Sequence, residues 1–227
     1  MAEKKRKPVA LVVGVGPGLG AALVRRFARE GMAVALAARR IDKLADLARE
    51  TGGKAYACDA TSEISVDDLF AGVERDLGTP RLVVFNAGGY VRKPAVELSA
   101  AEVETCWRSC CLGGFLVGRG AARAMLPGGP GTIIFTGATA ALRGSANFAA
   151  FAIGKFGLRA LAQSMARELG PQGIHVAHTI IDGSIGENAE ETRLAPDAIA
   201  ESYWQLHRQP RSAWTLELDL RPWAEKF

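Results

Sequence analysis

The sequence predicts a single α/β domain whose mainly parallel sheet is covered by helices on both faces. Short apolar runs of strand length alternate with longer amphipathic segments from Val9 to about Leu220. Such repeated strand–helix units build a parallel sheet with crossover helices. The chain has 227 residues, 48% of them hydrophobic, which suits one α/β domain with a substantial core. No break in composition and no internal repeat suggests a second domain.

The first half of the chain alternates strands and helices without interruption. The apolar run Val9–Val13 is the first strand, and a glycine-rich turn joins it to a helix that reaches Gly31, with Leu23 and Phe27 on one face. A second helix places Leu44 and Leu47 inward. The elements expected after the first helix are strand 34–37, helix 41–50, strand 54–58, helix 66–76 and strand 81–85.

The second half continues the same alternation. Ser99 begins a long helix that reaches about Met125, with Glu102 at the capping-box position. A helix over 148–169 ends at Gly170-Pro171, and Pro196 starts another that runs through His207. The strands expected here are 132–135, 174–181 and a last one at 214–218, and the polar segment 186–195 is expected to be mobile.

The glycine-rich turn between the first strand and the first helix indicates a dinucleotide site. Gly14, Gly16, Gly18 and Gly20 lie between a buried strand and a helix that returns to a second strand. Glycines let the backbone approach a pyrophosphate closely, and the helix N-terminus adds unpaired N–H groups and positive dipole character. This context predicts a Rossmann fold.

The end of the second strand favours NADP(H) over NAD(H). NAD sites of this design place a carboxylate there for the ribose 2′-hydroxyl. This chain has Arg39 and Arg40 instead, and a guanidinium suits a 2′-phosphate. The alternative is a pair of solvated arginines at a helix start with Asp42 as their partner, which leaves NAD as the second choice of cofactor.

Loops that carry polar or glycine residues follow each strand and therefore meet at one edge of the sheet. Ligands of open α/β sheets bind beyond the carboxyl ends of the strands, where the strand order reverses. Several independent loops at this edge support a ligand site more strongly than any single motif does. They are 14–20, 38–40, 59–61, 86–89, 136–139 and 182–185.

Charge and cysteine content exclude several other classes. The net charge is +4, much of it in the basic segment 1–8, which we expect to be a disordered tail before the domain 9–227. No basic stripe with interleaved aromatics suggests nucleic acid, and no apolar run suits a membrane span. The start lacks an apolar signal region, so a cytoplasmic location is expected. The four cysteines have no zinc spacing, so we expect no metal.

The chain resembles the short-chain dehydrogenase/reductase family over nearly its whole length. Gly14, Gly18 and Gly20 match the family's glycine pattern, Asp59 its adenine-binding acid, and Asn86-Ala87-Gly88 its Asn-Asn-Ala-Gly element. Asp182-Gly183 falls where the family has Pro-Gly beside the nicotinamide. With the arginines above, the resemblance implies a cofactor site made of Gly14, Gly16, Pro17, Gly18, Leu19, Gly20, Arg39, Arg40, Asp59, Ala60, Asn86, Ala87, Gly88, Lys155, Gly183 and Ile185.

The residues that carry the family's proton chemistry are different in this chain. The family uses Tyr-x-x-x-Lys, a Ser thirteen residues earlier and an Asn on the preceding helix. These positions are Phe151, Lys155, Ala138 and Cys110 here, so only the lysine remains. A phenyl ring carries no proton and a methyl group donates no hydrogen bond. Losing a general acid costs about 10²–10⁴ in rate.

Three hydroxyls are candidate substitutes. Thr139 and Thr136 lie beside the serine position, and Tyr90 follows the Asn-Ala-Gly-Gly turn. Each could equally be a turn residue that bonds the backbone or a packed aromatic ring. We take Thr139 as the candidate catalytic residue together with Lys155, and we note Phe151 and Ala138 at the tyrosine and serine positions.

Two function hypotheses follow. The first is an NADP-dependent oxidoreductase that acts on a small carbonyl or alcohol substrate with an atypical proton source. An alkene or imine substrate would also relax the need for the tyrosine. The second is a catalytically silent, nucleotide-binding relative with a regulatory or assembly role. The glycine loop, Asp59 and Lys155 disfavour a structural protein without cofactor. The resemblance also implies a homodimer or homotetramer.

Overall fold

The seven strands form one sheet in which every neighbouring pair is parallel. The computed structural model describes residues 6–186 and 192–225, and the strand order across the sheet is β3-β2-β1-β4-β5-β6-β7. The predicted α/β Rossmann fold is confirmed, and the sheet is wholly rather than mainly parallel among the residues described. The strands are β1 Val9–Val13, β2 Ala33–Ala38, β3 Lys54–Ala57, β4 Pro80–Phe85, β5 Gly131–Thr136, β6 Ile174–Ile181 and β7 Glu217–Leu220.

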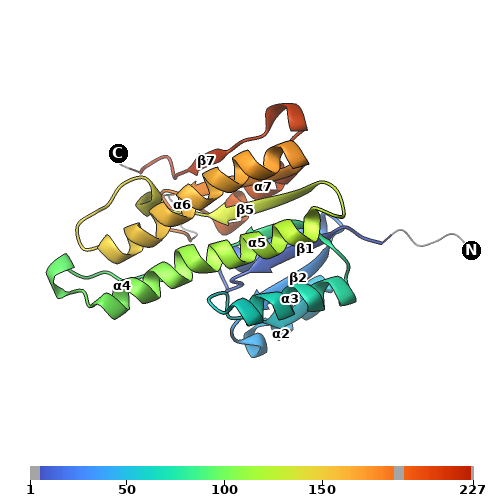
Figure 1. Ribbon diagram of the computed structural model, residues 1–227, viewed down its shortest axis with the longest axis horizontal. Coiled ribbons are helices and arrows are strands. Elements are labelled where there is room, and N and C mark those ends of the chain that lie inside the picture. Colours follow the sequence, from blue (N-terminus) through green and yellow to red (C-terminus); the bar gives the residue numbers. More distant parts are fainter. Residues whose placement is uncertain (1–5, 187–191, 226–227) are drawn as a thin grey trace, which may run out of the picture.

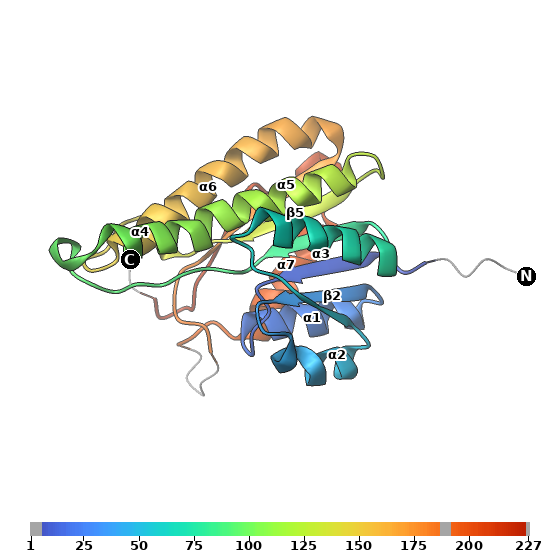
Figure 2. The same cartoon turned by 60° about the horizontal axis from the view of Figure 1, so that its bottom comes forward.

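Helices cover both faces of this sheet (Figures 1 and 2). On one face lie α1 (Leu19–Arg29), α2 (Ala45–Thr51) and α7 (Pro196–Arg208), and on the other α3 (Glu63–Asp76), α5 (Gly113–Met125) and α6 (Ala149–Leu169). Each face buries its own apolar cluster, because strand side chains alternate between the two faces. Helix α4 (Ala100–Trp107) extends beyond the sheet and packs against α6 (Figure 2).

The strand order reverses next to β1, and this reversal positions the site. The chain runs from β1 outward to β2 and β3, then returns to place β4 on the other side of β1. Val13 and Phe85 pair at the carboxyl ends of β1 and β4, so the loops that follow them lie side by side. The Asn86 side chain ties them together, since its Nδ2 donates to Gly14 O at 3.0 Å.

The long helix predicted from Ser99 is confirmed at its start and interrupted in its middle. Ser99 and Glu102 form the expected capping box. A π-helical turn, η3 (Arg108–Leu112), separates α4 from α5. Helix 41–50 likewise begins as a 3₁₀ turn, η1 (Ile41–Leu44), before α2. Helix α3 (Glu63–Asp76) starts three residues before the predicted 66–76. The Ser62 side chain caps it by accepting a hydrogen bond from Ser65 N.

The last strand lies later than the predicted 214–218. Residues before Glu217 are held in a turn instead, where Trp214 Nε1 donates to Gln209 O and Thr215 N donates to Gln209 Oε1. The Trp214 ring also stacks on His175 with a centroid distance of 4.9 Å. Residues 1–5 of the basic tail and residues 187–191, half of the segment expected to be mobile, lie outside the described residues. No helix in the described ranges is long and apolar enough to cross a membrane.

Candidate active site

A groove runs along the carboxyl edge of the sheet, as predicted for the site. It consists of two cavities of about 850 and 720 Å³. The walls of both include Gly14, Gly16 and the loop residues 86–88, so the two cavities adjoin one another. Every residue predicted for the cofactor site or the catalytic site lies in the wall of one cavity or the other. The strand ends therefore bring these residues together over a sequence distance of more than 160 residues.

Glycines in the loop after β1 have two different roles. Gly14 has φ +93°, and a Cβ there would lie 2.4 Å from the Ala87 backbone nitrogen, so this glycine lets the β1 and β4 loops touch. A Cβ on Gly16 or Gly18 would meet nothing within 4 Å. Helix α1 begins at Leu19 without a side-chain cap. This end of the groove thus combines open space with uncapped backbone N–H groups, which suits an anion.

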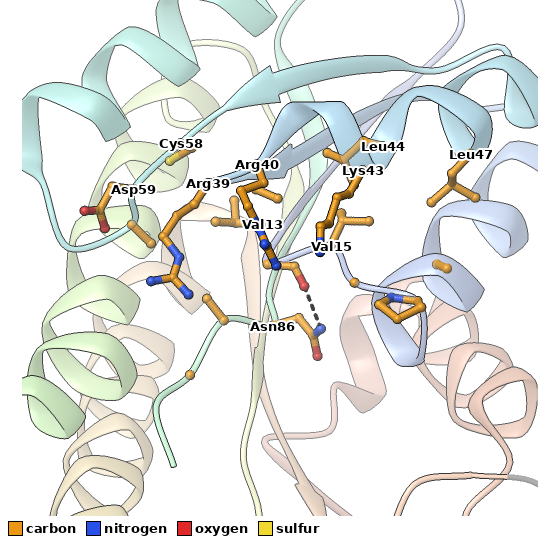
Figure 3. Close-up of a pocket in the computed structure, with 18 of the residues that line it drawn as sticks. Val13, Val15, Arg39, Arg40, Lys43, Leu44, Leu47, Cys58, Asp59 and Asn86 are labelled. Atoms are coloured by element: carbon orange, nitrogen blue, oxygen red, sulfur yellow. Dashed lines mark hydrogen bonds between the residues drawn. The ribbon is translucent and has the colours of Figure 1, made fainter. Parts of the chain in front are cut away.

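Three cationic side chains face the larger cavity. Figure 3 shows Arg39, Arg40 and Lys43 extending from the end of β2 and from η1 toward the glycine loop and Asn86. No ion pair joins any of the three to a carboxylate among the described residues, Asp42 included. Lys43 was not predicted, although its position three residues after Arg40 in a helical turn could have indicated it.

Asp59 borders the same cavity and is fixed by its own turn. Its Oδ1 accepts hydrogen bonds from Thr61 N at 2.9 Å and from Thr61 Oγ1 at 2.8 Å. These bonds hold the pKa of the Asp59 carboxyl below its usual value, so it is an anion near neutral pH. Figure 3 places Asp59 on the far side of Arg39 from Asn86. Ala60 and Thr61 complete this wall.

Lys155 is a buried amino group in the wall of the smaller cavity. It is 5% exposed, and its Nζ donates to Thr136 O at 2.7 Å. Burial lowers the pKa of Lys155, because the charged form loses its hydration. The Phe151 ring centre lies 5.7 Å from Nζ. Phe151 and Ala138 thus present an apolar surface beside a cation.

The three candidate hydroxyls lie in different environments. Thr136 Oγ1 bonds to the buried Tyr203 hydroxyl at 3.0 Å, which commits it to the core. Thr139 lines the smaller cavity and its Oγ1 donates to Asp182 Oδ1 at 2.6 Å. Tyr90 lines the same cavity, is 64% exposed, and its ring centre lies 5.5 Å from that of Phe151. Ser145, which was not considered from the sequence, is also in this wall.

Cys110, which was predicted at the family's asparagine position, is part of a buried thiol pair. The Sγ atoms of Cys106 and Cys110 both lie 3.4 Å from Gly89 O. Burial and the neighbouring Cys110 thiol raise the pKa of Cys106 to about 11, so it is a thiol at neutral pH. No cluster of three metal-binding side chains occurs within the described ranges. The pair thus packs the loop 88–89 against α4 and the π-helical turn.

The loop after β6 closes the far end of the groove. Gly183 and Ile185 line the smaller cavity. Gly183 has φ +147°, and a Cβ there would lie 2.8 Å from Pro222 Cδ, so the C-terminal segment packs closely against this loop. Asp182 is 2% exposed and is not among the residues that line either cavity. Leu19, Ile181 and Phe148 add to the apolar lining.

Fold and groove together define a class of α/β protein in which a wholly parallel sheet carries a glycine-rich turn and a two-part groove at its carboxyl edge. The sequence profile of the short chain dehydrogenase family matches residues 8–194. The chain belongs to this family, a family of oxidoreductases.

Known relatives match along most of the chain. A short-chain dehydrogenase/reductase, eriH, from Hericium erinaceus is 32% identical over 214 residues, which cover 86% of this chain and 85% of the relative. The crystal structure of a short-chain dehydrogenase from Rhodopseudomonas palustris is 42% identical with a TM-score of 0.87, and the match covers 96% of this chain and 100% of that one. A metagenomic short-chain oxidoreductase solved with NADP is 29% identical, with a TM-score of 0.84 and coverage of 96% and 97%.

Proposed function

We propose that this protein is an NADP(H)-dependent oxidoreductase that acts on a small carbonyl or alcohol compound. The observation that carries the proposal is that a cationic, glycine-rich cavity adjoins a more apolar cavity whose wall contains the buried Lys155. A bound nicotinamide supplies or accepts a hydride. The related structure solved with NADP supports this choice of coenzyme.

The residues present fit such a coenzyme. The open space beside Gly16 and Gly18 and the uncapped start of α1 would hold the pyrophosphate. Arg39 and Arg40, helped by Lys43, would hold the 2′-phosphate, because guanidinium groups bind phosphate bidentately. The Lys155 ammonium would donate to ribose hydroxyls once it is released from Thr136 O.

The substrate half departs from the family pattern in its proton chemistry. We infer that Phe151, Ala138 and Cys110 take the places of the family's tyrosine, serine and asparagine. Thr136, Thr139, Tyr90 and Ser145 all line the cavity near these positions, and of these the Thr136 hydroxyl is bonded to Tyr203. The candidate proton sources of this chain are therefore Thr139, Tyr90 and Ser145.

A catalytically silent, nucleotide-binding role is the second candidate. Its support is the apolar surface that Phe151 and Ala138 present where a substrate oxygen would need a hydrogen-bond donor. Both roles require the nucleotide, and they differ in turnover. A screen of carbonyl and alcohol compounds with the wild-type protein separates them: turnover supports the enzyme, and tight NADPH binding without any turnover supports the silent role.

Nucleotide binding is tested by replacing the two arginines. For each of the single variants Arg39→Ala and Arg40→Ala, we expect the Kd for NADPH to rise by about 10- to 100-fold, since a hydrogen bond to a charged group contributes about 1.5–3 kcal/mol. The Kd for NADH is expected to change little. Fluorescence titration with both nucleotides measures this, with Arg75→Ala as control, because Arg75 and its partner Asp76 lie outside the groove wall. Equal losses for both nucleotides would contradict the assignment to the 2′-phosphate.

We also propose that the protein is a homo-oligomer through the outer faces of α4, the π-helical turn, α5 and α6. Four large apolar side chains there are 38–50% exposed: Trp107, Phe115, Ile153 and Phe156. We expect light scattering to give at least twice the chain mass of 24.0 kDa for the wild type and the monomer mass for Phe156→Glu. An Ile41→Glu variant in η1 is the control, since Ile41 is exposed and η1 packs on the opposite face of the sheet. A monomeric wild type would overturn the proposal.

A further inference from the structure

A buried carboxylate lies directly behind the substrate half of the groove. Asp182 follows β6 and is 2% exposed. Its Oδ1 accepts from Thr139 Oγ1 at 2.6 Å and lies 3.8 Å from the Arg143 guanidinium, and its Oδ2 lies 3.3 Å from that of Arg221. Each carboxylate oxygen thus has its own partner, and the orientation of the group is fixed. The family resemblance places a proline here, so the carboxylate is a feature of this chain.

The direction of the Thr139 hydrogen bond decides what this hydroxyl can do. A threonine hydroxyl has one proton and two acceptor lone pairs. Because the proton is donated to Asp182, Thr139 Oγ1 has only lone pairs left for a molecule in the cavity. It can accept a proton from a substrate alcohol, and it cannot donate one to a carbonyl while Asp182 is ionised. The short, charge-assisted bond strengthens this polarity.

We propose that Thr139 and Asp182 form a proton-accepting relay, and that the substrates of this protein are primary or secondary alcohols that it oxidises. This rests on the proposed function, which provides the oxidised nicotinamide as hydride acceptor. The carbinol C–H bond breaks with its electron pair, which goes to the nicotinamide. The alcohol O–H proton passes to Thr139 Oγ1 as the threonine's own proton passes to Asp182 Oδ1. The alcohol becomes a carbonyl, the nicotinamide is reduced, and Asp182 holds the released proton.

Lys155 and Tyr90, the neighbouring polar groups, are less suited to accept the alcohol proton. Lys155 Nζ is 5% exposed and donates to Thr136 O at 2.7 Å, and no carboxylate among the described residues pairs with it to take a proton onward. Tyr90 lies in the cavity wall, but no carboxylate or amine among the described residues bonds its hydroxyl. The Thr139–Asp182 pair is the arrangement here in which a hydroxyl facing the cavity is backed by a base.

The relay is tested first by binding, without turnover. The probe is 2,2,2-trifluoroethanol, which donates a hydrogen bond strongly and resists oxidation, titrated by fluorine NMR into the protein saturated with NADP⁺. Thr139→Val is expected to weaken its binding about 10-fold, since the acceptor is lost. Asp182→Asn is expected to leave it within about twofold, because the threonine oxygen remains. Thr132→Val, which removes a buried hydroxyl at the opposite end of β5, is the matched control.

Turnover of an alcohol found in the substrate screen then separates binding from chemistry. Thr139→Val and Asp182→Asn are each expected to lower kcat about 10²–10⁴-fold, whereas Thr139→Ser and Thr132→Val stay within about 10-fold of the wild type. The wild-type solvent deuterium isotope effect is expected to vanish in Asp182→Asn. Circular dichroism melts identify a variant that does not fold, and Thr139→Ser keeps the test decisive in that case.

Two failures are distinguishable. If Thr139→Val binds the probe and turns over as the wild type does, the relay is overturned while the proposed function stands. Loss of turnover in Tyr90→Phe would then assign the proton transfer to Tyr90. If the wild type binds neither NADPH nor NADP⁺, or oxidises and reduces nothing, the proposed function falls and the relay with it.

Discussion

Replacing Phe151 by Tyr and Ala138 by Ser together is expected to raise the rate of carbonyl reduction by about 10²–10⁴-fold over the wild type. The double variant restores a phenol and a hydroxyl at positions that already line the substrate cavity. The Lys155 ammonium lies 5.7 Å from the centre of the ring at 151, where its charge would favour the phenolate and assist proton transfer. The gain corresponds to about 3–5 kcal/mol of activation free energy.

The measurement is NADPH oxidation with a panel of aldehydes and ketones. The matched control is Phe148→Tyr, which adds the same hydroxyl to another ring of the cavity wall and has no contact with Lys155 among its ring and cation contacts. We expect that control to remain within about threefold of the wild type. No gain in the double variant would mean that Phe151 and Ala138 do not occupy the family's catalytic positions.

The outcome also bears on the two candidate functions. If the wild type is silent, the double variant creates activity from a scaffold that already binds the nucleotide. If the wild type oxidises alcohols through Thr139 and Asp182, the double variant adds a second proton path, so Thr139→Val should lower kcat less in that background than in the wild type.

Local patterns in the sequence were sufficient to predict the fold and the position of the groove. The glycine spacing after β1 and the apolar periodicity of the strands are written in short windows, and parallel strands bring their carboxyl ends to one edge. The predicted fold is therefore confirmed, and the predicted site residues line two adjoining cavities, although their roles remain predictions.

Features that depend on distant partners could not be predicted in the same way. Thr139 and Asp182 are 43 residues apart, and their hydrogen bond depends on how β5 and β6 end side by side. The late start of β7 depends on the packing of Trp214 on His175 and on its bond to Gln209 O. Neither pairing has a signal in the local sequence, because hydrogen-bond partners across a sheet are set by register.

Alanine substitutions at two glycines of the same loop are expected to have different effects, one on stability and the other on NADPH binding. Gly14→Ala is expected to lower the free energy of unfolding by about 2–5 kcal/mol, because it adds the strain of a positive φ to an overpacked contact. Its Cβ would lie 2.4 Å from the backbone nitrogen of Ala87, and neither strand end can retreat without disturbing the sheet.

Gly16→Ala is expected to keep the stability of the wild type within about 0.5 kcal/mol and to raise the Kd for NADPH at least 10-fold. A Cβ at Gly16 meets no atom of the protein within 4 Å, so its methyl group would project into the open groove. Urea unfolding and NADPH titration of both variants measure the two effects separately. If Gly16→Ala bound NADPH as tightly as the wild type, the phosphates would not lie against this loop. Because the two residues are only two positions apart, the contrast between packing and binding isolates the part of the loop that a coenzyme must reach.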